Sequence, residues 1–204
     1  MITTPTVLVL GAGASQPYGF PSAGELADLI CKTFTSENSD GCRFFDSQAN
    51  LTAGDFLRFR EALLKSDSAS VDAFLEYRQE FMSIGKLAIA YCLMPFEKEE
   101  KLFQCDGARG EHWYKHLSGK LSASFDKFGD NKLSIITFNY DRSLEHYLLT
   151  TLANMHGKNW KDCADTIAKI PIVQVYGQLS ATPYPASGSR SGRDARHSLQ
   201  SGLQ

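Results

Sequence analysis

Two short groups of residues in this sequence could act on a phosphorylated ligand. The first is GAGAS, residues 11–15, which follows an apolar run. Glycine has no side chain, so backbone N–H groups there can approach the oxygens of a pyrophosphate. A tight turn that needs small residues for packing explains the motif equally well, because the third glycine of the dinucleotide fingerprint is missing. The candidate phosphate-binding residues are Gly11, Ala12, Gly13, Ala14 and Ser15.

The second group is TFNYD, residues 137–141, at the end of another apolar run. Asn139 and Asp141 are two positions apart, so in extended backbone their side chains point to the same side. An amide there can hold ribose hydroxyls or orient a water. Asp141 is equally suited to capping the helix expected after it. Thr137, Asn139 and Asp141 are therefore candidate ligand-binding residues, and Asn139 is the strongest of them.

Both groups need strands and helices to position them. The apolar runs at 6–10, 133–138 and 170–176 predict three strands, the first buried on both faces. Helical spacing of apolar residues predicts helices at 22–34, 71–93 and 112–128, and another helix after Asp141. Ser22 and Glu25 have the spacing of a capping box. Residues 36–54 are polar and predict a loop.

Strands separated by helices indicate an α/β fold with a parallel sheet, in which ligands bind beyond the carboxyl ends of the strands. We expect one domain over residues 1–180, with a loop and helical insertion at about 36–130. The last residues, 181–204, are rich in Ser, Gly and Arg and predict a polar tail without regular structure. A truncated or altered C-terminus and a native flexible tail fit this composition equally well.

Composition excludes several classes of function. The 204 residues contain 21 basic and 23 acidic side chains, so no overall field attracts nucleic acid or an anionic membrane. The five cysteines are scattered and odd in number, which argues against a zinc site and a disulfide framework. We expect no metal. The first apolar run is too short to span a bilayer or act as a signal peptide, so we expect a cytoplasmic protein.

The ordered set GAGAS, GFPSAGEL, SVDAFLE, TFNYDRSLEHYL and VYGQL resembles the sirtuin-like NAD-hydrolysing domains of bacterial anti-phage defence proteins. The resemblance covers residues 7–179. It implies a Rossmann-like parallel sheet with flanking helices, an NAD site with the glycine loop at the pyrophosphate, and action of Asn139 at the nicotinamide ribose. It also implies that Asp72 lies near the pocket, although a helix-start role explains Asp72 more simply. The zinc-binding cysteine pairs of sirtuin deacetylases are missing.

Related enzymes have a His before the glycine of VYG, where this chain has Tyr176. A tyrosine with its ordinary pKa near ~10 is a poor base at neutral pH. Asn139 and Tyr176 are the candidate catalytic residues. Each of the five histidines is more simply explained as a surface or helix-face residue, and His146, which follows Asp141 by little more than one helical turn, is the best substitute for the missing base.

The resemblance thus predicts an NAD hydrolase that releases nicotinamide and ADP-ribose, acts in anti-phage defence, forms a homo-oligomer and works with a sensor or another defence protein. The alternative is an inactive NAD or ADP-ribose sensor. A protein deacetylase or an ADP-ribosyltransferase is the third functional hypothesis.

Overall fold

The computed structural model describes residues 1–45, 51–103 and 112–179, and these residues divide into two compact units. The sheet unit contains Met1–Gly19 and the described residues from Glu97 onward. The helical unit is Phe20–Phe96. The predicted polar tail at 181–204 lies outside the described residues.

The sheet unit is built on three parallel strands in the order β1-β2-β3. These are β1 (Thr6–Leu10), β2 (Leu133–Thr137) and β3 (Ile172–Gln174). The register pairs Leu10 with Thr137 and Thr137 with Gln174, so the three carboxyl ends form one edge. The predicted α/β class with a parallel sheet is therefore confirmed.

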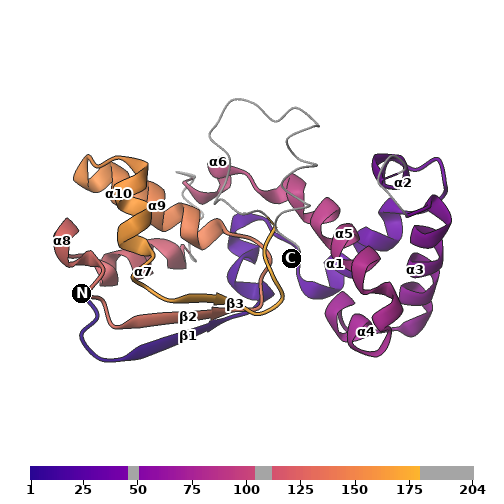
Figure 1. Cartoon of the computed structure of the whole chain (residues 1–204), viewed down its shortest axis with the longest axis horizontal. Helices are drawn as coiled ribbons and strands as arrows, with labels where there is room; N and C mark the ends of the chain where they lie inside the picture. Colours follow the sequence, from indigo (N-terminus) through magenta and orange to yellow (C-terminus); the bar gives the residue numbers. More distant parts are fainter. Residues whose placement is uncertain (46–50, 104–111, 180–204) are drawn as a thin grey trace. The chain divides into compact units, whose positions relative to one another are not determined.

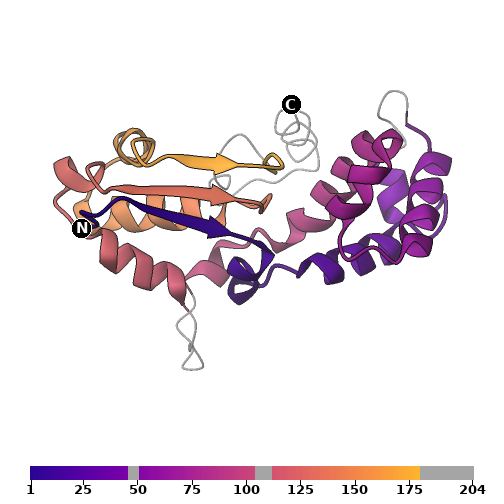
Figure 2. The ribbon, with the colours of Figure 1, turned by 90° about the horizontal axis from the view of Figure 1, so that it is seen from below.

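All of the sheet unit's described helices lie on the same side of the sheet (Figure 1, Figure 2). They are η1 (Ala12–Ala14), η2 (Gln16–Tyr18), α6 (Glu99–Leu102), α7 (Trp113–Leu121), α8 (Phe125–Phe128), α9 (Ser143–His156) and α10 (Trp160–Ile167). Leu133 and Ile135 point toward these helices and are buried. Val7 and Val9 point the other way and are exposed. The prediction that the first strand is buried on both faces is therefore wrong, because the described helices cover one face and Val7 and Val9 on the other are exposed.

The helical unit is held together by an aromatic cluster. Its elements are α1 (Ala23–Thr33), α2 (Asp40–Phe45), α3 (Ala53–Ser66), α4 (Val71–Tyr77), η3 (Gln79–Phe81), α5 (Met82–Leu93) and η4 (Met94–Phe96). The rings of Phe34 and Phe45 each stack on Phe56, with centroids 4.9 Å apart in both pairs, and all three side chains are fully buried. The segment at 36–54 was predicted as a loop but contains α2, because Phe45 packs into this aromatic cluster.

The start of α1 follows the sequence prediction. The Ser22 hydroxyl accepts a hydrogen bond from the Glu25 N–H, and the Glu25 carboxylate accepts one from the Ser22 N–H, which completes the capping box. The helical stretch at 71–93 is divided into α4, η3 and α5. The helical unit includes α1, whereas α7 and α8 belong to the sheet unit. The expected insertion at about 36–130 stays a prediction.

Within the described residues, every helix is too short or too polar to cross a lipid bilayer.

Candidate functional site

The glycine loop leaves β1 as two consecutive 3-10 turns. The Ala14 N–H donates to the Gly11 carbonyl at 2.8 Å, and the Ser15 N–H donates to the Ala12 carbonyl at 3.1 Å. The N–H groups of Ala12 and Gly13 open the first turn and have no partner within it. The loop is therefore ordered by its own backbone and still presents backbone donors.

The fold itself does not require the two glycines of this loop. A methyl group added at Gly11 would meet nothing within 4 Å, and one at Gly13 would meet only Gln16 Oε1, at 3.8 Å. Neither glycine has a positive φ. A turn that needed small residues for packing would show crowding at these positions, so the packing explanation loses its support. The bare backbone faces open space, as close approach of a ligand would require.

Asn139 joins the end of β2 to the glycine loop. Its Nδ2 donates to the Gly11 carbonyl and to the Ser15 hydroxyl, both at 3.0 Å. Its backbone N–H donates to Thr137 Oγ1 at 3.1 Å. These bonds fix the orientation of the amide, because a carbonyl can only accept. The Oδ1 atom of Asn139 has no hydrogen-bond partner among the described residues and remains able to accept.

Asp141 is buried and accepts hydrogen bonds at both carboxylate oxygens. Ser15 Oγ donates to Oδ2 at 2.7 Å, and the Ser143 N–H donates to Oδ1 at 3.1 Å. The Ser143 hydroxyl also donates to Oδ1. This geometry makes Asp141 a support for Ser15 and for the first turn of α9. Burial raises the pKa of Asp141, and the hydrogen bonds from Ser143 and Ser15 oppose that rise.

Tyr114 of α7 extends this network. Its hydroxyl lies 2.6 Å from Ser143 Oγ, and both groups are buried. Ser143 gives its single hydroxyl proton to Asp141, so Tyr114 is the donor to Ser143. Next to Tyr114, the Trp113 indole donates to the Ala14 carbonyl at 2.8 Å. The sequence predicts no hydrogen bond for the Tyr114 hydroxyl or for Ser143, because a hydroxyl carries no local signal of a partner far along the chain.

A cavity of about 20 Å³ lies within this network. It is lined by Leu10, Ala14, Ser15, Tyr114, Ile135, Thr137, Asn139, Asp141, Leu144, Glu145 and Ile172. Such a volume holds one water and no larger molecule. A dinucleotide would therefore have to lie outside the cavity, along the exposed glycine loop.

Glu145 is a residue of this cavity that was not predicted from sequence. Its carboxylate forms a two-pronged ion pair with the Arg142 guanidinium, with the shortest contact 2.7 Å, and accepts from Gln174 Nε2 at 3.3 Å. Burial raises the pKa of Glu145, and Arg142 opposes the rise. The signal that could have found the pair is its spacing of three in the first turn of a helix.

Tyr176 lies among aromatic rings. Its ring is 5.6 Å from the Phe138 ring, edge to face, and 6.2 Å from the Tyr140 ring, stacked. His146 does not line the 20 Å³ cavity, and its ring lies 5.7 Å from the Trp160 ring. The structure thus brings together the glycine loop, Thr137, Asn139 and Asp141, whereas Tyr176 and His146 are outside that cavity lining.

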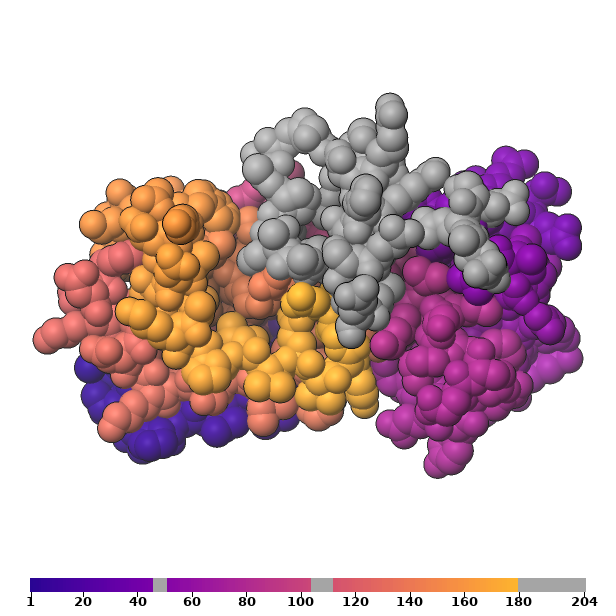
Figure 3. Space-filling model, in the orientation of Figure 1, coloured from indigo at the N-terminus to yellow at the C-terminus, as the bar shows by residue number. Residues whose placement is uncertain are grey.

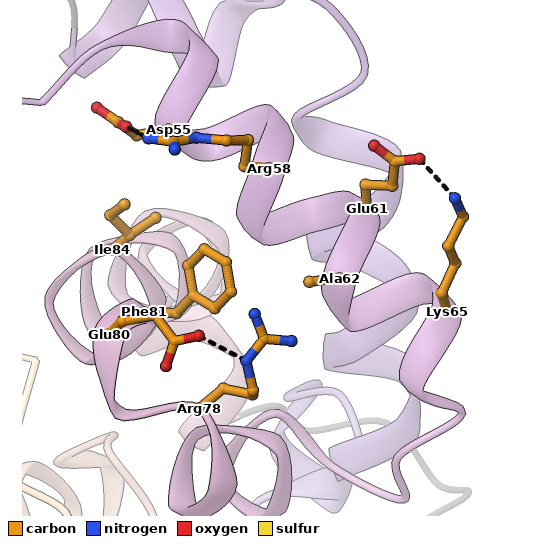
Figure 4. A pocket seen from close by; sticks show the side chains of 9 residues that line it. All are labelled: Asp55, Arg58, Glu61, Ala62, Lys65, Arg78, Glu80, Phe81 and Ile84. Carbon is orange, nitrogen blue, oxygen red and sulfur yellow. Dashed lines mark hydrogen bonds and ion pairs between the residues drawn. The ribbon is translucent and has the colours of Figure 1, made fainter.

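In two larger cavities, the charged side chains of the lining are already paired with one another. One of about 460 Å³, beside α9, α10 and β3, is mostly apolar, and its two charged residues, Arg142 and Glu145, are paired with each other. The other, of about 750 Å³, is a groove of the helical unit (Figure 4). Its cations and acids are joined as the pairs Arg58–Asp55, Lys65–Glu61 and Arg78–Glu80. Asp72 of α4 is also in the helical unit.

Among the described residues, no three His, Cys, Asp or Glu side chains are grouped to hold a metal ion. Comparisons with protein-family models, with curated proteins and with solved structures found no match for this chain.

Proposed function

We propose that this chain binds NAD along the glycine loop and hydrolyses its nicotinamide–ribose bond, releasing nicotinamide and ADP-ribose. The observation that carries the proposal is the position of Asn139, whose amide is bonded to Gly11 and Ser15 and therefore stands beside the exposed loop. A Rossmann-like, sirtuin-like assignment of the sheet unit belongs to the same proposal.

The glycine loop supports the phosphate part of the proposal. Gly11 and Gly13 face open space, and the N–H groups at the start of the first 3-10 turn can donate to phosphate oxygens. The carboxyl edge of a parallel sheet is where ligands of open α/β folds bind. Ser15 would act mainly by holding Asn139, because its hydroxyl proton is given to Asp141.

Asn139 supports the chemical part. In the hydrolysis, the bond between the ribose C1′ and the nicotinamide nitrogen breaks, and nicotinamide leaves with the electron pair. A water oxygen bonds to C1′, and its proton passes to solvent. The Oδ1 atom of Asn139 can accept a hydrogen bond from a ribose hydroxyl or from the attacking water. Because two bonds fix the amide beforehand, little ordering is needed when the substrate arrives.

A second candidate function is a sensor that binds NAD or ADP-ribose without cleaving it. Glu145, the one acid of the cavity besides Asp141, is paired with Arg142, and no histidine lines the cavity. The phenol of Tyr176 is a poor base at neutral pH. The site could therefore bind the ligand and lack the means to activate water. A role in anti-phage defence, with an oligomer and a partner protein, is proposed on the motif resemblance alone.

Purified protein separates the two candidates in one pair of measurements. Calorimetry with NAD and with ADP-ribose measures binding, and chromatography of the same mixture measures released nicotinamide. Binding with nicotinamide release supports the hydrolase. Binding of both ligands with no release, at any protein concentration, supports the sensor. Absence of binding to either ligand would overturn both.

A further inference from the structure

Figure 2 shows the side of the sheet that the described helices of the sheet unit leave uncovered. Apolar side chains on that side are exposed. We call this surface the open sheet face and define it as Val7, Val9, Ile136, Phe138, Val173 and Val175. The exposed fractions are 59% for Val7, 65% for Val9, 40% for Phe138, 55% for Val173 and 46% for Val175. The strand register places Val9, Ile136 and Val173 side by side, so the surface is continuous across all three strands.

An exposed face of this kind is unusual for parallel strands, which are normally covered on both faces. Single exposed apolar side chains are common, but a continuous apolar surface marks a binding surface. In the space-filling view, the N-terminal residues that include β1 (indigo) and the β3 segment (yellow) both reach the surface (Figure 3). The continuous exposure of the open sheet face therefore indicates a binding surface, whereas exposure of a single valine would not.

The charge pattern of the face indicates what covers it. The strand positions on this side are Val7, Val9, Ser134, Ile136 and Val173, and none of them is charged. Phe138 and Val175, which follow the ends of β2 and β3, are uncharged as well. The nearest charge in the alternation is Lys132, which precedes β2 at the rim. A partner that recognises its target through ion pairs would find nothing to pair with here. An identical face brings no charges to bury, and the net charge of −2 gives little repulsion between copies.

We propose that the open sheet face binds the open sheet face of a second copy of this chain. Flat faces of β-branched residues pack about 10 Å apart in sheet-on-sheet interfaces. A two-fold axis through the face satisfies both copies at once, because each presents the same residues to the other. The valines of the two copies then bury each other, and Lys132 remains at the rim. This proposal is independent of NAD binding.

Sedimentation of the full chain over a wide range of concentrations tests the proposal. The variants are Val9→Lys and Val173→Lys, which place a charge in the middle of the face. Met155→Lys is the matched control, because Met155 is 61% exposed but lies at the end of α9, in the helical layer. We expect a discrete dimer for the wild type and for Met155→Lys, and monomers for the two face variants.

A monomeric wild type at all concentrations would overturn the proposal and assign the face to a different partner. Dimers in both lysine variants would overturn it too, since another surface would then hold the copies together. Circular dichroism checks that the lysine variants fold. If they do not, Val9→Ser removes apolar surface without adding charge and should weaken the dimer roughly tenfold or more. An unchanged dissociation constant for folded Val9→Ser contradicts the proposed interface.

Discussion

The Ser15 hydroxyl donates a hydrogen bond to Asp141 Oδ2 at 2.7 Å, and 126 positions of sequence separate the two residues. The same hydroxyl oxygen accepts from Asn139 Nδ2 at 3.0 Å. One serine thus connects a buried carboxylate to the amide that we propose acts on the substrate. The arrangement of Asn139 depends on this connection, because the amide has no other side-chain partner among the described residues.

Ser15→Ala should destabilise the fold. The variant removes one of the donors to a buried carboxylate, and such a loss costs about 2 kcal/mol. Urea unfolding of both proteins at neutral pH measures the difference. Ser134→Ala is the control, because Ser134 lies on β2 but makes no side-chain hydrogen bond with the described residues. Equal stabilities of wild type and Ser15→Ala would contradict the importance of this bond.

The effect of Ser15→Ala should also depend on pH. The pKa of Asp141 is already raised by burial, and loss of the Ser15 bond should raise it further. A carboxyl group whose folded-state pKa lies above its unfolded value stabilises the fold below the unfolded pKa, and this contribution is lost as the pH rises through the folded pKa. The stability gap between wild type and variant should therefore widen as the pH rises above the ordinary aspartate range. A gap that stays constant from acidic to neutral pH would refute this assignment.

Gly13→Val should abolish NAD binding and leave the fold intact. The new side chain would occupy the open space in front of the loop, where the pyrophosphate is proposed to lie. Its Cβ would approach only Gln16 Oε1, at 3.8 Å, so the loop should tolerate it. Calorimetry measures the affinity, and the melting temperature reports the fold. Gly119→Val is the matched control, since Gly119 on α7 also faces open space. Unchanged NAD affinity in a folded Gly13→Val protein would remove the loop from the proposed site.

Asn139→Ala should lose nearly all turnover if the chain is a hydrolase. Alanine provides neither the fixed amide nor its acceptor oxygen, and removal of one transition-state contact costs on the order of a hundredfold in rate. The melting temperature should change little, since Asn139 is only half-buried. Nicotinamide release is followed for wild type and variant together. Asn154→Ala, which removes an exposed amide on α9, is the control. Equal rates for wild type and Asn139→Ala would exclude the proposed role.

Asp55→Asn should destabilise the helical unit at neutral pH and have less effect in acid. The Thr52 N–H, the Thr52 hydroxyl and Arg58 donate to the Asp55 carboxylate and lower its pKa from 3.8 to about 2 (Figure 4 shows Asp55 and Arg58). A depressed folded-state pKa gives stability that is present above the unfolded value and is lost as the pH falls through the folded value.

The melting temperatures of wild type and Asp55→Asn should therefore converge between about pH 4 and pH 2. Asp165→Asn provides the comparison, because Asp165 is an exposed acid of α10 without a hydrogen bond or ion pair to the described residues. If the difference in melting temperature between Asp55→Asn and wild type stays the same across this pH range, the capping interactions do not depend on the charge of Asp55.

Local interactions made several elements predictable from sequence. The capping box of α1 needs only Ser22 and Glu25, which are three positions apart. The three strands follow from short apolar runs, and the alternation with helices indicates their parallel order. The capping box and the position of each strand are decided by neighbours within a few residues, so a single sequence contains enough information to identify them. The parallel order is inferred from the alternation of strands and helices along the chain. The meeting of the glycine loop with Asn139 follows from parallel order as well, because parallel strands end at one edge.

Other features depend on residues far apart in the chain, and only the tertiary structure decided them. The helix α2 forms in a polar segment because Phe45 packs on Phe56, which no local pattern reveals. Ser143 and Tyr114 join the site through the register that pairs Leu10 with Thr137 and brings α7 against α9. The exposure of Val9 depends on which face of the sheet the helices cover. The same apolar run occurs in strands that are covered on one face and in strands that are covered on both, so the sequence does not distinguish the two cases.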